Sequence, residues 1–343
     1  LLLLPLLLLP PATSVQPGDK FNYTLAQLSF EYAAASYADD PSPCLSKNGA
    51  SLVMRVEVAC DAVRDKCWAI VANAPEYIVV AFQGTSSRTQ LIAELIETIT
   101  SPKHDLEGIG SVQRYFYVAL KSISKPLVEK LIKLKETYPH KPILFTGHSL
   151  GGALASLAAV LYANHTATLG YNETTYLYTF GQPRVGNHEY SSTVDRLVPQ
   201  AWRLVHKADL VAHIPYCVGF RSCGDFLNHS PYHHGTEVFF AENMGPHDLY
   251  KVCTGLPLDE DSSCSDANYL YNIDDHLFYF EEHVSDYGVN GCRPMNSTVE
   301  GIEEPPYERM QLRRLRREAV KRMIQDYIEY LEDPRRLLLS NAL

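Results

Sequence analysis

Residues 143–155 read ILFTGHSLGGALA, and this stretch decides how the chain folds. A short β-rich run leads into Gly147-His148-Ser149-Leu150-Gly151, and small residues then open a helical pattern. A serine on so sharp a turn needs neighbours without bulky Cβ groups, which Gly147 and Gly151 supply. The turn places the Ser149 hydroxyl at the amino end of a helix, where N–H groups stabilise developing negative charge. The pattern predicts that Ser149 is a nucleophile; a plain glycine-rich turn is the alternative.

Strand-like and helix-like patterns alternate along the chain. Apolar residues recur at helical spacing in 24–37, 124–137 and 150–163. From the middle of the chain onward the order is strand, helix, strand, which requires crossover connections. This order predicts an α/β fold with a mostly parallel central sheet, helices on both faces, and an active site at the carboxyl ends of the strands. The predicted strands are 52–58, 68–72, 77–82, 143–146, 175–180, 202–206 and 237–240.

An acidic residue and a histidine are needed to activate the serine, because a serine hydroxyl is a poor nucleophile at neutral pH. In folds with this strand-serine-helix turn, the acid and then the histidine follow the serine along the chain. Asp209 lies just after the predicted strand 202–206, so it is the predicted acid. Asp195 falls in a predicted helix and Asp225 lies between Cys223 and a sequon, so we expect both on the solvated surface.

Thirteen histidines compete for the role of base. His276 is the best placed of those that follow Asp209, because core-type residues flank it in 274–280 (DDHLFYF). His233 and His234 have no nearby cysteine or acidic ligand set, so they indicate hydrogen-bonded structure and no metal site. The other histidines that fit the chain order are His213, His229, His247 and His283.

Two donors must bind the negative oxygen that forms when a serine attacks a carbonyl group. The Leu150 N–H is one, and the loop after the strand 77–82 supplies Thr85 as the second, with a plain turn as the alternative. The apolar stretch 89–100 (TQLIAELIETIT) is either a lid helix over the site or an ordinary buried helix. Its apolar positions include Leu91, Ile92, Leu95 and Ile96.

The composition excludes several classes of protein. With 46% hydrophobic residues and 22 tyrosines among 343 residues, the chain has enough apolar material for a packed core, which excludes disorder. The net charge of -10 argues against a nucleic-acid partner, because affinity for phosphates comes from clustered Lys and Arg.

The beginning of the chain resembles the apolar core and small-residue cleavage region of a secretory signal. Residues 1–9 are almost pure leucine, too short a run to span a bilayer, which takes about 20 residues. We therefore expect a signal-peptide remnant at 1–16 and a secreted protein. Eight cysteines, an even number, indicate disulfides rather than zinc. Five sequons fit a glycoprotein: Asn22, Asn164, Asn172, Asn228 and Asn296.

One domain is expected over 17–294, followed by a C-terminal extension at 295–343. Within the extension, residues 309–332 have the pattern of one long helix, and six arginines, one lysine and a single glutamate lie between Arg309 and Arg322. This segment is basic and amphipathic. It either contacts an anionic membrane surface or docks on the domain, and docking is the favoured interpretation.

Five motifs together resemble the lipase class 3 family, the fungal-type triacylglycerol lipases with an α/β-hydrolase fold. They are FQGTSS at 82–87, TGHSLGGALA at 146–155, TFGQPRVGN at 179–187, HKADLVAHIP at 206–215 and DHLFYF at 275–280. The resemblance spans about residues 24–292. It implies the same roles for Ser149, Asp209, His276, Thr85 and Leu150, a structural turn at 181–187, a lid helix, a lipid ester substrate at an interface and no cofactor.

The chain departs from the family pattern at several positions. Gln83 replaces a common Arg, Gln113 a common His and Ala212 the usual Pro. Gln90 and Leu91 replace the Asn-Trp that many fungal members have in the lid. The resemblance therefore does not predict lid opening, interfacial activation or substrate preference for this chain.

Sequence proximity narrows the pairing of the eight cysteines. Cys60 with Cys67, Cys217 with Cys223, and Cys253 with Cys264 each close a small loop. The remaining pair, Cys44 with Cys292, resembles the terminal bridge of some family members and joins the first helical region to the end of the domain.

These observations predict a secreted serine hydrolase that cleaves carboxylic esters of lipids through an acyl-enzyme. The alternatives within enzymes are a phospholipase and an esterase that acts on soluble or plant-wall esters. The alternative from another class is a catalytically silent α/β-hydrolase that serves as a binding protein. The presence of Ser149, Asp209, His276 and the oxyanion residues argues against a silent protein.

Overall fold

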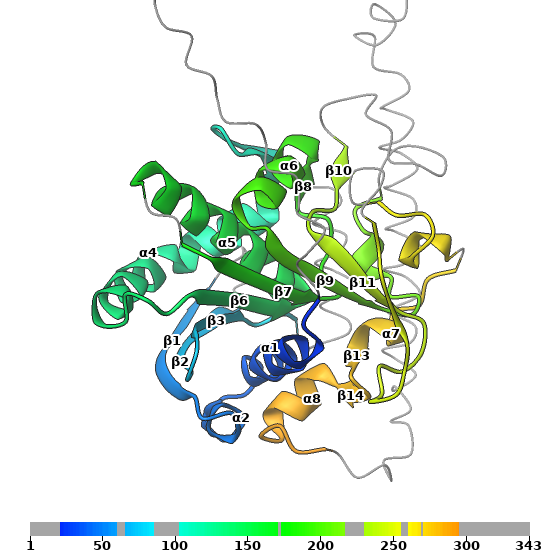
Figure 1. The fold of residues 1–343 in the computed structure, drawn as a ribbon, viewed down its shortest axis with the longest axis horizontal. Helices are drawn as coiled ribbons and strands as arrows, with labels where there is room; N and C mark the ends of the chain where they lie inside the picture. Colours follow the sequence, from blue (N-terminus) through cyan, green and yellow to red (C-terminus); the bar gives the residue numbers. More distant parts are fainter. Residues whose placement is uncertain are drawn as a thin grey trace, which may run out of the picture.

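A computed structural model describes residues 21–59, 66–85, 103–170, 173–216, 230–254, 260–268 and 270–294. Within these residues, eight strands form one sheet in the order β1-β2-β3-β6-β7-β9-β11-β12 (Figure 1). The strands are β1 (Ser51–Ala59), β2 (Lys66–Asn73), β3 (Ile78–Phe82), β6 (Ile143–His148), β7 (Thr175–Phe180), β9 (Gln200–His206), β11 (Thr236–Phe240) and β12 (Tyr250–Val252).

Two smaller sheets and several helices complete the described part of the chain. One small sheet contains β4 (Lys103–Leu106), β5 (Gly110–Gln113), β8 (Gly186–Asn187) and β10 (Pro231–Tyr232), and the other contains β13 (Phe278–Tyr279) and β14 (Glu282–His283). The α-helices are α1 (Tyr23–Ala35), α2 (Ser42–Lys47), α4 (Arg114–Thr137), α5 (Leu150–Thr168), α6 (His188–Leu197), α7 (Asp274–Leu277) and α8 (Val284–Val289). The 3₁₀-helices are η1 (Val211–His213) and η2 (Ser265–Ala267).

The centre of the large sheet is parallel, which confirms the predicted fold class. β3, β6, β7, β9 and β11 pair in parallel, whereas β1, β2 and β12 add antiparallel partners at the two edges. α4, α5 and α6 pack on one face and α1 and α8 on the other (Figure 1). Because both faces are covered, every residue of β3 and β6 is buried. The carboxyl ends of the parallel strands therefore meet at one edge of the sheet.

Helix α4 begins ten residues earlier than the predicted helix 124–137. The apolar spacing continues through Phe116, Leu120 and Ile123, all of which are buried against the sheet. Pro126 lies inside the helix, where a proline costs about 3 kcal/mol. Burying each of the three side chains contributes roughly 1.5–3 kcal/mol, so packing outweighs the proline.

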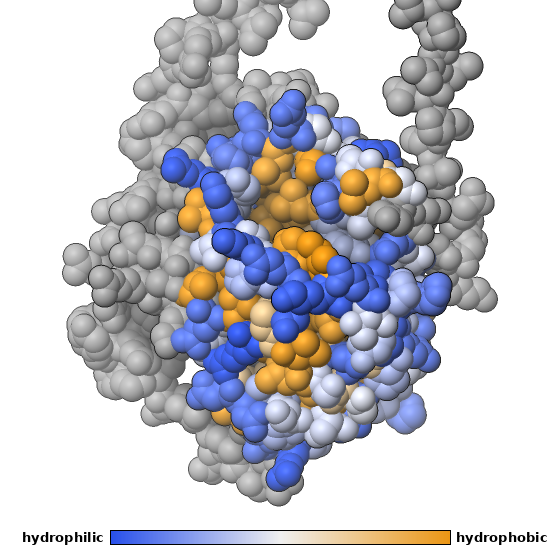
Figure 2. Space-filling model, turned by 90° about the vertical axis from the view of Figure 1, so that its left-hand side faces the viewer, coloured by the Kyte–Doolittle hydropathy of each residue, from blue (hydrophilic) through white to orange (hydrophobic). Residues whose placement is uncertain are grey.

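The outer face of α4 carries exposed apolar side chains among charged ones. Val118, Val128 and Ile132 are exposed on this helix, and lysines lie between them in the sequence. Figure 2 views this side of the molecule and shows apolar patches separated by hydrophilic side chains. Scattered exposure of this kind is ordinary for a protein surface.

Several predicted features lie outside the described residues. These are the signal remnant at 1–16, the lid positions Leu91, Ile92, Leu95 and Ile96, the cysteines Cys60 and Cys223, Cys217, the sequons Asn172, Asn228 and Asn296, and the extension 295–343. The backbone of Cys67 belongs to β2, but its side chain is also outside the description. Among the helices that are described, none combines the length and apolar character needed to cross a bilayer.

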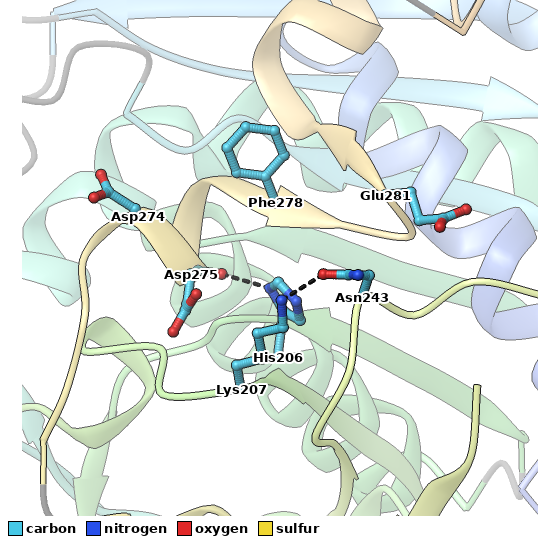
Figure 3. Close-up of a pocket in the computed structure, with 7 residues that line it drawn as sticks. All are labelled: His206, Lys207, Asn243, Asp274, Asp275, Phe278 and Glu281. Atoms are coloured by element: carbon cyan, nitrogen blue, oxygen red, sulfur yellow. Dashed lines mark hydrogen bonds between the residues drawn. The ribbon is translucent and has the colours of Figure 1, made fainter. Parts of the chain in front are cut away.

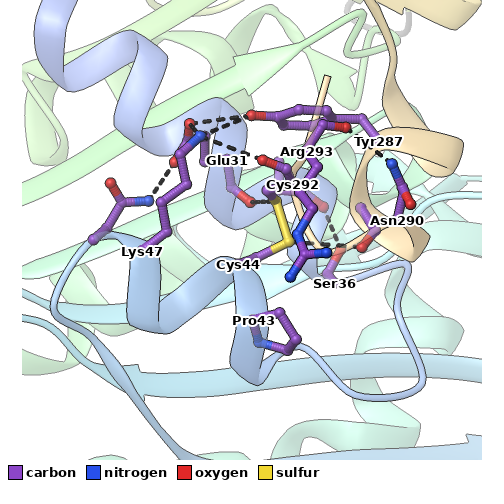
Figure 4. Close-up of a disulfide and its surroundings, with 12 residues drawn as sticks. Glu31, Ser36, Pro43, Cys44, Lys47, Tyr287, Asn290, Cys292 and Arg293 are labelled. Atoms are coloured by element: carbon purple, nitrogen blue, oxygen red, sulfur yellow. Dashed lines mark hydrogen bonds and ion pairs between the residues drawn. A yellow bond between two sulfur atoms is a disulfide. The ribbon is translucent and has the colours of Figure 1, made fainter. Parts of the chain in front are cut away.

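Two of the four predicted cysteine pairs lie within the described residues, and both are bonded. Cys253 is bonded to Cys264. Cys44 is bonded to Cys292 and joins α2 to the segment that follows α8 (Figure 4). Beside this bond, Lys47 Nζ donates to Glu31 Oε1 at 2.5 Å and to the Tyr287 hydroxyl at 3.1 Å. The bond and these contacts hold the two ends of the domain together.

Replacing both Cys44 and Cys292 with alanine should lower the free energy of unfolding by about 2–5 kcal/mol, because the bond restricts the unfolded chain. The bond spans 248 residues of sequence, whereas Cys253–Cys264 spans 11. Loop-closure entropy therefore predicts a smaller loss for the Cys253→Ala/Cys264→Ala variant. Denaturant titration of both variants checks this, and an equal or larger loss for the short loop would contradict it.

Candidate active site

Ser149 lies on a strained turn between β6 and α5. Its backbone angles are φ 61° and ψ -131°, a backbone conformation that residues other than glycine rarely adopt. Two contacts hold the turn: the Ser149 N–H donates to Phe180 O at 2.9 Å, and Gly151 packs against β3 so closely that a Cβ there would lie 2.2 Å from Phe82 O. The turn therefore requires glycine at position 151, as the sequence pattern predicts.

Asp209 follows β9 and is fully buried. Its Oδ1 accepts from the Val211 N–H at 2.8 Å and the Ala212 N–H at 3.4 Å, and its Oδ2 accepts from the Tyr279 hydroxyl at 2.7 Å. Burial alone would raise the pKa of this carboxyl group, but His276 and the hydrogen bonds outweigh burial and lower the pKa of Asp209 to about 2. Asp209 is therefore a carboxylate at neutral pH.

His276, in α7, is paired with Asp209. Its Nδ1 lies 2.9 Å from Asp209 Oδ2 and 3.0 Å from Oδ1. Since a carboxylate only accepts, Nδ1 carries the proton and Nε2 is left as an acceptor when the ring is neutral. The ring is buried, and Nε2 has no hydrogen-bond partner among the described residues.

Short links join Ser149 to this pair. His148, the residue before Ser149, stacks on the His276 ring with 4.4 Å between the ring centroids. Gly181 follows Phe180, the residue that binds the Ser149 N–H, and a Cβ on Gly181 would lie 2.5 Å from Asp209 Oδ2 and 2.6 Å from His276 Nδ1. Ser149 Oγ, like His276 Nε2, is buried and has no partner in the described part of the chain. The three residues predicted from sequence thus gather at one edge of the sheet.

The loop that carries Thr85 runs against the nucleophile turn. A Cβ on Gly84 would lie 2.4 Å from His148 O and 3.1 Å from Ser149 Cβ, so the residue before Thr85 touches that turn directly. Leu150 is the first residue of α5, and an α-helix leaves its first N–H groups without an acceptor inside the helix. Leu150 therefore directly follows Ser149, and Thr85 follows a residue that contacts the turn at Ser149.

His148 and Tyr37 are site residues that the sequence analysis missed. His148 Nε2 donates to His276 O at 2.8 Å, so its Nδ1 accepts from the Tyr37 hydroxyl at 2.8 Å. Burial, followed by the nearby His276, lowers the pKa of His148 well below its usual value, and the ring is neutral. His148 precedes Asp209, so the chain order that points to a base does not point to His148; its place inside the Gly-x-Ser-x-Gly motif is the sequence signal for it.

The residues that the sequence assigns no catalytic role, His233, His234 and Asp195, make hydrogen bonds within the fold. His234 Nε2 lies 2.7 Å from Ser156 Oγ, and His233 lies among buried polar groups, as hydrogen-bonded structure requires. Asp195 is only half buried, but its Oδ1 accepts from the Gly235 N–H at 2.6 Å, so it is not simply a solvated surface residue. Among the described residues, the group with the spacing of a metal site is Glu237, Cys253 and Cys264, and those cysteines are bonded to each other.

A cavity of about 280 Å³ lies beside α7, and Ser149, Asp209 and His276 are not among the residues that line it. Figure 3 shows its lining, which is polar and charged apart from the Phe278 ring, and His206 Nδ1 donates there to Asp275 O at 2.8 Å. Such a lining does not suit an acyl chain. The lining residues are His206, Lys207, Asn243, Asp274, Asp275, Phe278 and Glu281.

A parallel sheet with a strained serine after one strand, and an acid and a histidine that follow it in chain order, defines a serine hydrolase of the α/β-hydrolase class. The family model for lipase (class 3) matches residues 79–219. A Caenorhabditis elegans protein named Lipase ZK262.3 is 34% identical over 304 residues, which cover 81% of this chain and 85% of the relative. The chain belongs to the lipase class 3 family, and it is a carboxylic ester hydrolase.

Fungal lipases are similar in sequence and in fold. The lipase of Rhizomucor miehei is 30% identical over 239 residues, which cover 65% of this chain and 61% of that protein. Its native propeptide complex matches the structure with a TM-score of 0.62 at 24% identity, over 76% of this chain and 81% of that one. A lipase from Rhizopus microsporus var. chinensis matches with a TM-score of 0.61 at 24% identity, over 80% and 94% of the two chains. At this identity the structural matches support the fold.

Replacing Gly181 with alanine should lower kcat/KM on the order of 100-fold or more, because the new Cβ would separate Asp209 from His276. Gly170→Ala is the matched control: both glycines have positive φ (57° and 80°), but a Cβ on Gly170 meets nothing within 4 Å. Both variants share the backbone strain, so ester turnover and thermal unfolding are measured for each. Equal activities in the two variants would show that the contact at Gly181 is unimportant.

The buried Asp209 should make stability depend on acid pH. Its pKa of about 2 in the folded protein lies below the ordinary value of 3.8, so its stabilising effect is present above about pH 4 and is lost as pH falls through 2. This difference corresponds to about 2 kcal/mol. The gap in unfolding free energy between wild type and Asp209→Asn should therefore shrink by about 2 kcal/mol between pH 5 and pH 2. Urea titrations check this, and parallel pH curves would contradict it.

Proposed function

We propose that Ser149, His276 and Asp209 form the catalytic triad of this ester hydrolase. The single observation that carries the proposal is that the buried Ser149 Oγ and His276 Nε2 both lack a partner among the described residues, while Asp209 binds the other nitrogen of the same ring. A proton acceptor and a hydroxyl left unpaired in a buried site are unfavourable unless function requires them. The links through His148 and Gly181 support this assignment.

The proposed reaction has two halves. Ser149 Oγ attacks the ester carbonyl carbon while His276 Nε2 takes its proton, and the Asp209 carboxylate stabilises the resulting imidazolium. The Leu150 N–H and Thr85 bind the oxyanion. The intermediate collapses, the alcohol leaves with the proton from Nε2, and Ser149 remains acylated. A water molecule then attacks the acyl group, again with His276 as base, and releases the carboxylic acid.

The proposed substrate is the ester bond of a lipid, met at an interface. The similar proteins are named lipases, and one from Gibberella zeae, 30% identical over 217 residues, is named a secreted mono- and diacylglycerol lipase. Ser149 is 1% exposed, so its hydroxyl lies below the surface of the molecule. The tail at 309–332 remains a predicted membrane or domain contact.

We also propose that the protein works outside the cell. Two disulfides are present in the described residues, and such bonds persist in oxidising compartments. The sequon residue Asn22 is exposed and caps α1, since its Oδ1 accepts from the Leu25 N–H at 3.0 Å. A glycan is attached through the amide nitrogen, so this cap is compatible with glycosylation.

Ser149→Ala should lower kcat by on the order of 10⁴ to 10⁶ and abolish labelling by an active-site-directed phosphonate, because both need the hydroxyl. Ser124→Ala, on the exposed side of α4, is the control and should keep both. Turnover of a soluble ester and mass spectrometry of the labelled chain check this. A Ser149→Ala protein with full turnover would remove the triad assignment.

The substrate class is tested separately with emulsified triacylglycerol, phospholipid vesicles and a monomeric short-chain ester. A lipase should hydrolyse the emulsion faster than the monomeric ester. Preference for the phospholipid would indicate a phospholipase, and preference for the monomeric ester would indicate an ordinary esterase. Each outcome leaves the triad assignment intact.

A further inference from the structure

The loop that carries Asp209 rests on a buried set of charged side chains. We define the acid loop as residues 209–215, and the ionic cluster as Arg184, His233 and Glu260, all of which are nearly inaccessible to solvent. Arg184 comes from the turn after β7, His233 from the segment between β10 and β11, and Glu260 from the segment closed by the Cys253–Cys264 bond. None of the three belongs to the proposed catalytic machinery.

The ionic cluster contacts the carbonyl groups of four consecutive residues of the acid loop. Arg184 Nη1 donates to His213 O at 2.6 Å and to Pro215 O at 3.3 Å, and the Arg184 backbone N–H donates to Ile214 O at 2.8 Å. His233 Nε2 lies 2.7 Å from Ala212 O. The side chains of the cluster therefore determine where the backbone of this loop lies.

Glu260 organises the other two members. Arg184 donates to it through Nε at 2.8 Å and Nη2 at 2.6 Å, a two-point contact that fixes the guanidinium plane. The backbone N–H of His233 donates to Glu260 Oε1 at 2.9 Å, and the ring nitrogen Nδ1 of His233 lies 2.9 Å from Glu260 Oε2. Burial would raise the pKa of Glu260, but Arg184 and then His233 hold it well below its usual value, so the carboxylate is ionised.

The neighbouring charges make Glu260 the main counterion of Arg184. Asp266 Oδ1 lies farther away, 3.7 Å from Arg184 Nη2 and 3.4 Å from His213 Nε2. Burial, opposed by Arg184 and aided by Glu260, raises the pKa of Asp266 to about 7, so its charge is partial near neutral pH. Both ring nitrogens of His233 face acceptors, Glu260 Oε2 and Ala212 O; a neutral ring donates to one of them, and the imidazolium donates to both. Burial, followed by Arg184 and Arg203, lowers the pKa of His233, and the direct contact with Glu260 opposes that effect.

The position of the acid loop is passed directly to the carboxylate of Asp209. His213 Nδ1 donates to Asp209 O at 2.8 Å, and the Val211 and Ala212 N–H groups donate to Asp209 Oδ1. A shift of the loop therefore moves both the backbone and the side chain of Asp209. Displacements near 1 Å in a catalytic arrangement can lower rates by about 100-fold.

We propose that Glu260, through Arg184 and His233, positions Asp209 for its contact with His276. These are positioning residues, since they touch the acid loop and not the reacting atoms. The inference rests on the proposed triad. A buried ion pair contributes little net stability compared with apolar residues of similar size, so a positioning role explains better why charges are present here.

Glu260→Gln tests the proposal, with Glu237→Gln as the matched control. Glu237 is equally buried and lies 3.7 Å from Arg203. Its link to the acid loop is indirect, since it accepts from the Ser265 N–H, and Ser265 Oγ lies 3.2 Å from His213 Nε2. Both variants leave a buried arginine without its carboxylate, so both should lose thermal stability. Glu260→Gln alone should lower kcat about 10- to 100-fold with little change in KM.

The pH profile separates positioning from general destabilisation. If Asp209 is displaced, the His276 imidazolium loses its stabilising partner, so the acidic limb of kcat/KM should move to lower pH in Glu260→Gln and stay in place in Glu237→Gln. His233→Asn, whose shorter amide can replace Nδ1 beside Glu260 but does not reach Ala212 O, keeps the Arg184–Glu260 pair, should show the same shift and decides the question if Glu260→Gln does not fold.

Two results would overturn the proposal. One is an unshifted profile with wild-type kcat in His233→Asn or in a folded Glu260→Gln. The other is an equal loss of kcat and an equal profile shift in Glu260→Gln and Glu237→Gln. Failure of the triad itself is distinguished by Ser149→Ala: an active Ser149→Ala protein rejects the triad, whereas an inactive one beside a normal Glu260→Gln rejects the positioning role alone.

Discussion

The contact between the Asp209 carboxylate and the His276 ring is the interaction on which the rest of the site depends. Both groups are buried, and a buried carboxylate is unfavourable unless it is paired and hydrogen bonded. Asp209 meets this requirement with donors from η1, β13 and α7. Because α7 and β13 are distant from Asp209 in sequence, the buried carboxylate has all of these partners only when the fold is complete.

The parallel sheet explains why the nucleophile lies near that contact. β6, β7 and β9 are neighbours and run in the same direction, so the residues that follow them share one edge. The strained Ser149 follows β6, Gly181 follows β7, and Asp209 lies beyond β9. A positive φ at a serine costs on the order of 1–3 kcal/mol and persists because the surrounding structure over-determines it. Here the fixed partners are Phe180 O and the start of α5.

Behind the reacting groups, the polar interior is ordered by charge rather than by apolar packing. Arg184, which is bound by Glu260, donates to carbonyl groups of the loop that carries Asp209, while His148 donates to the backbone oxygen of His276. The Cys253–Cys264 bond closes the segment that supplies Glu260. Directional hydrogen bonds define position more narrowly than apolar contacts do, which suits a site where small shifts change the rate.

The sequence by itself determined the parallel α/β architecture and the turn at Ser149, and it indicated Asp209 and His276 as candidates, because strand and helix periodicity, backbone sterics at glycine and chain order are readable in neighbouring residues. It also indicated β7 with the bounds that the structure has. Only the tertiary structure decided that α4 begins at Arg114, that Tyr37 and His148 join His276, that Gly181 lies close to both Asp209 and His276, and that Glu260 binds Arg184 beneath the acid loop. These features depend on contacts between residues far apart in the chain, and packing, not local sequence, determines which side chains meet.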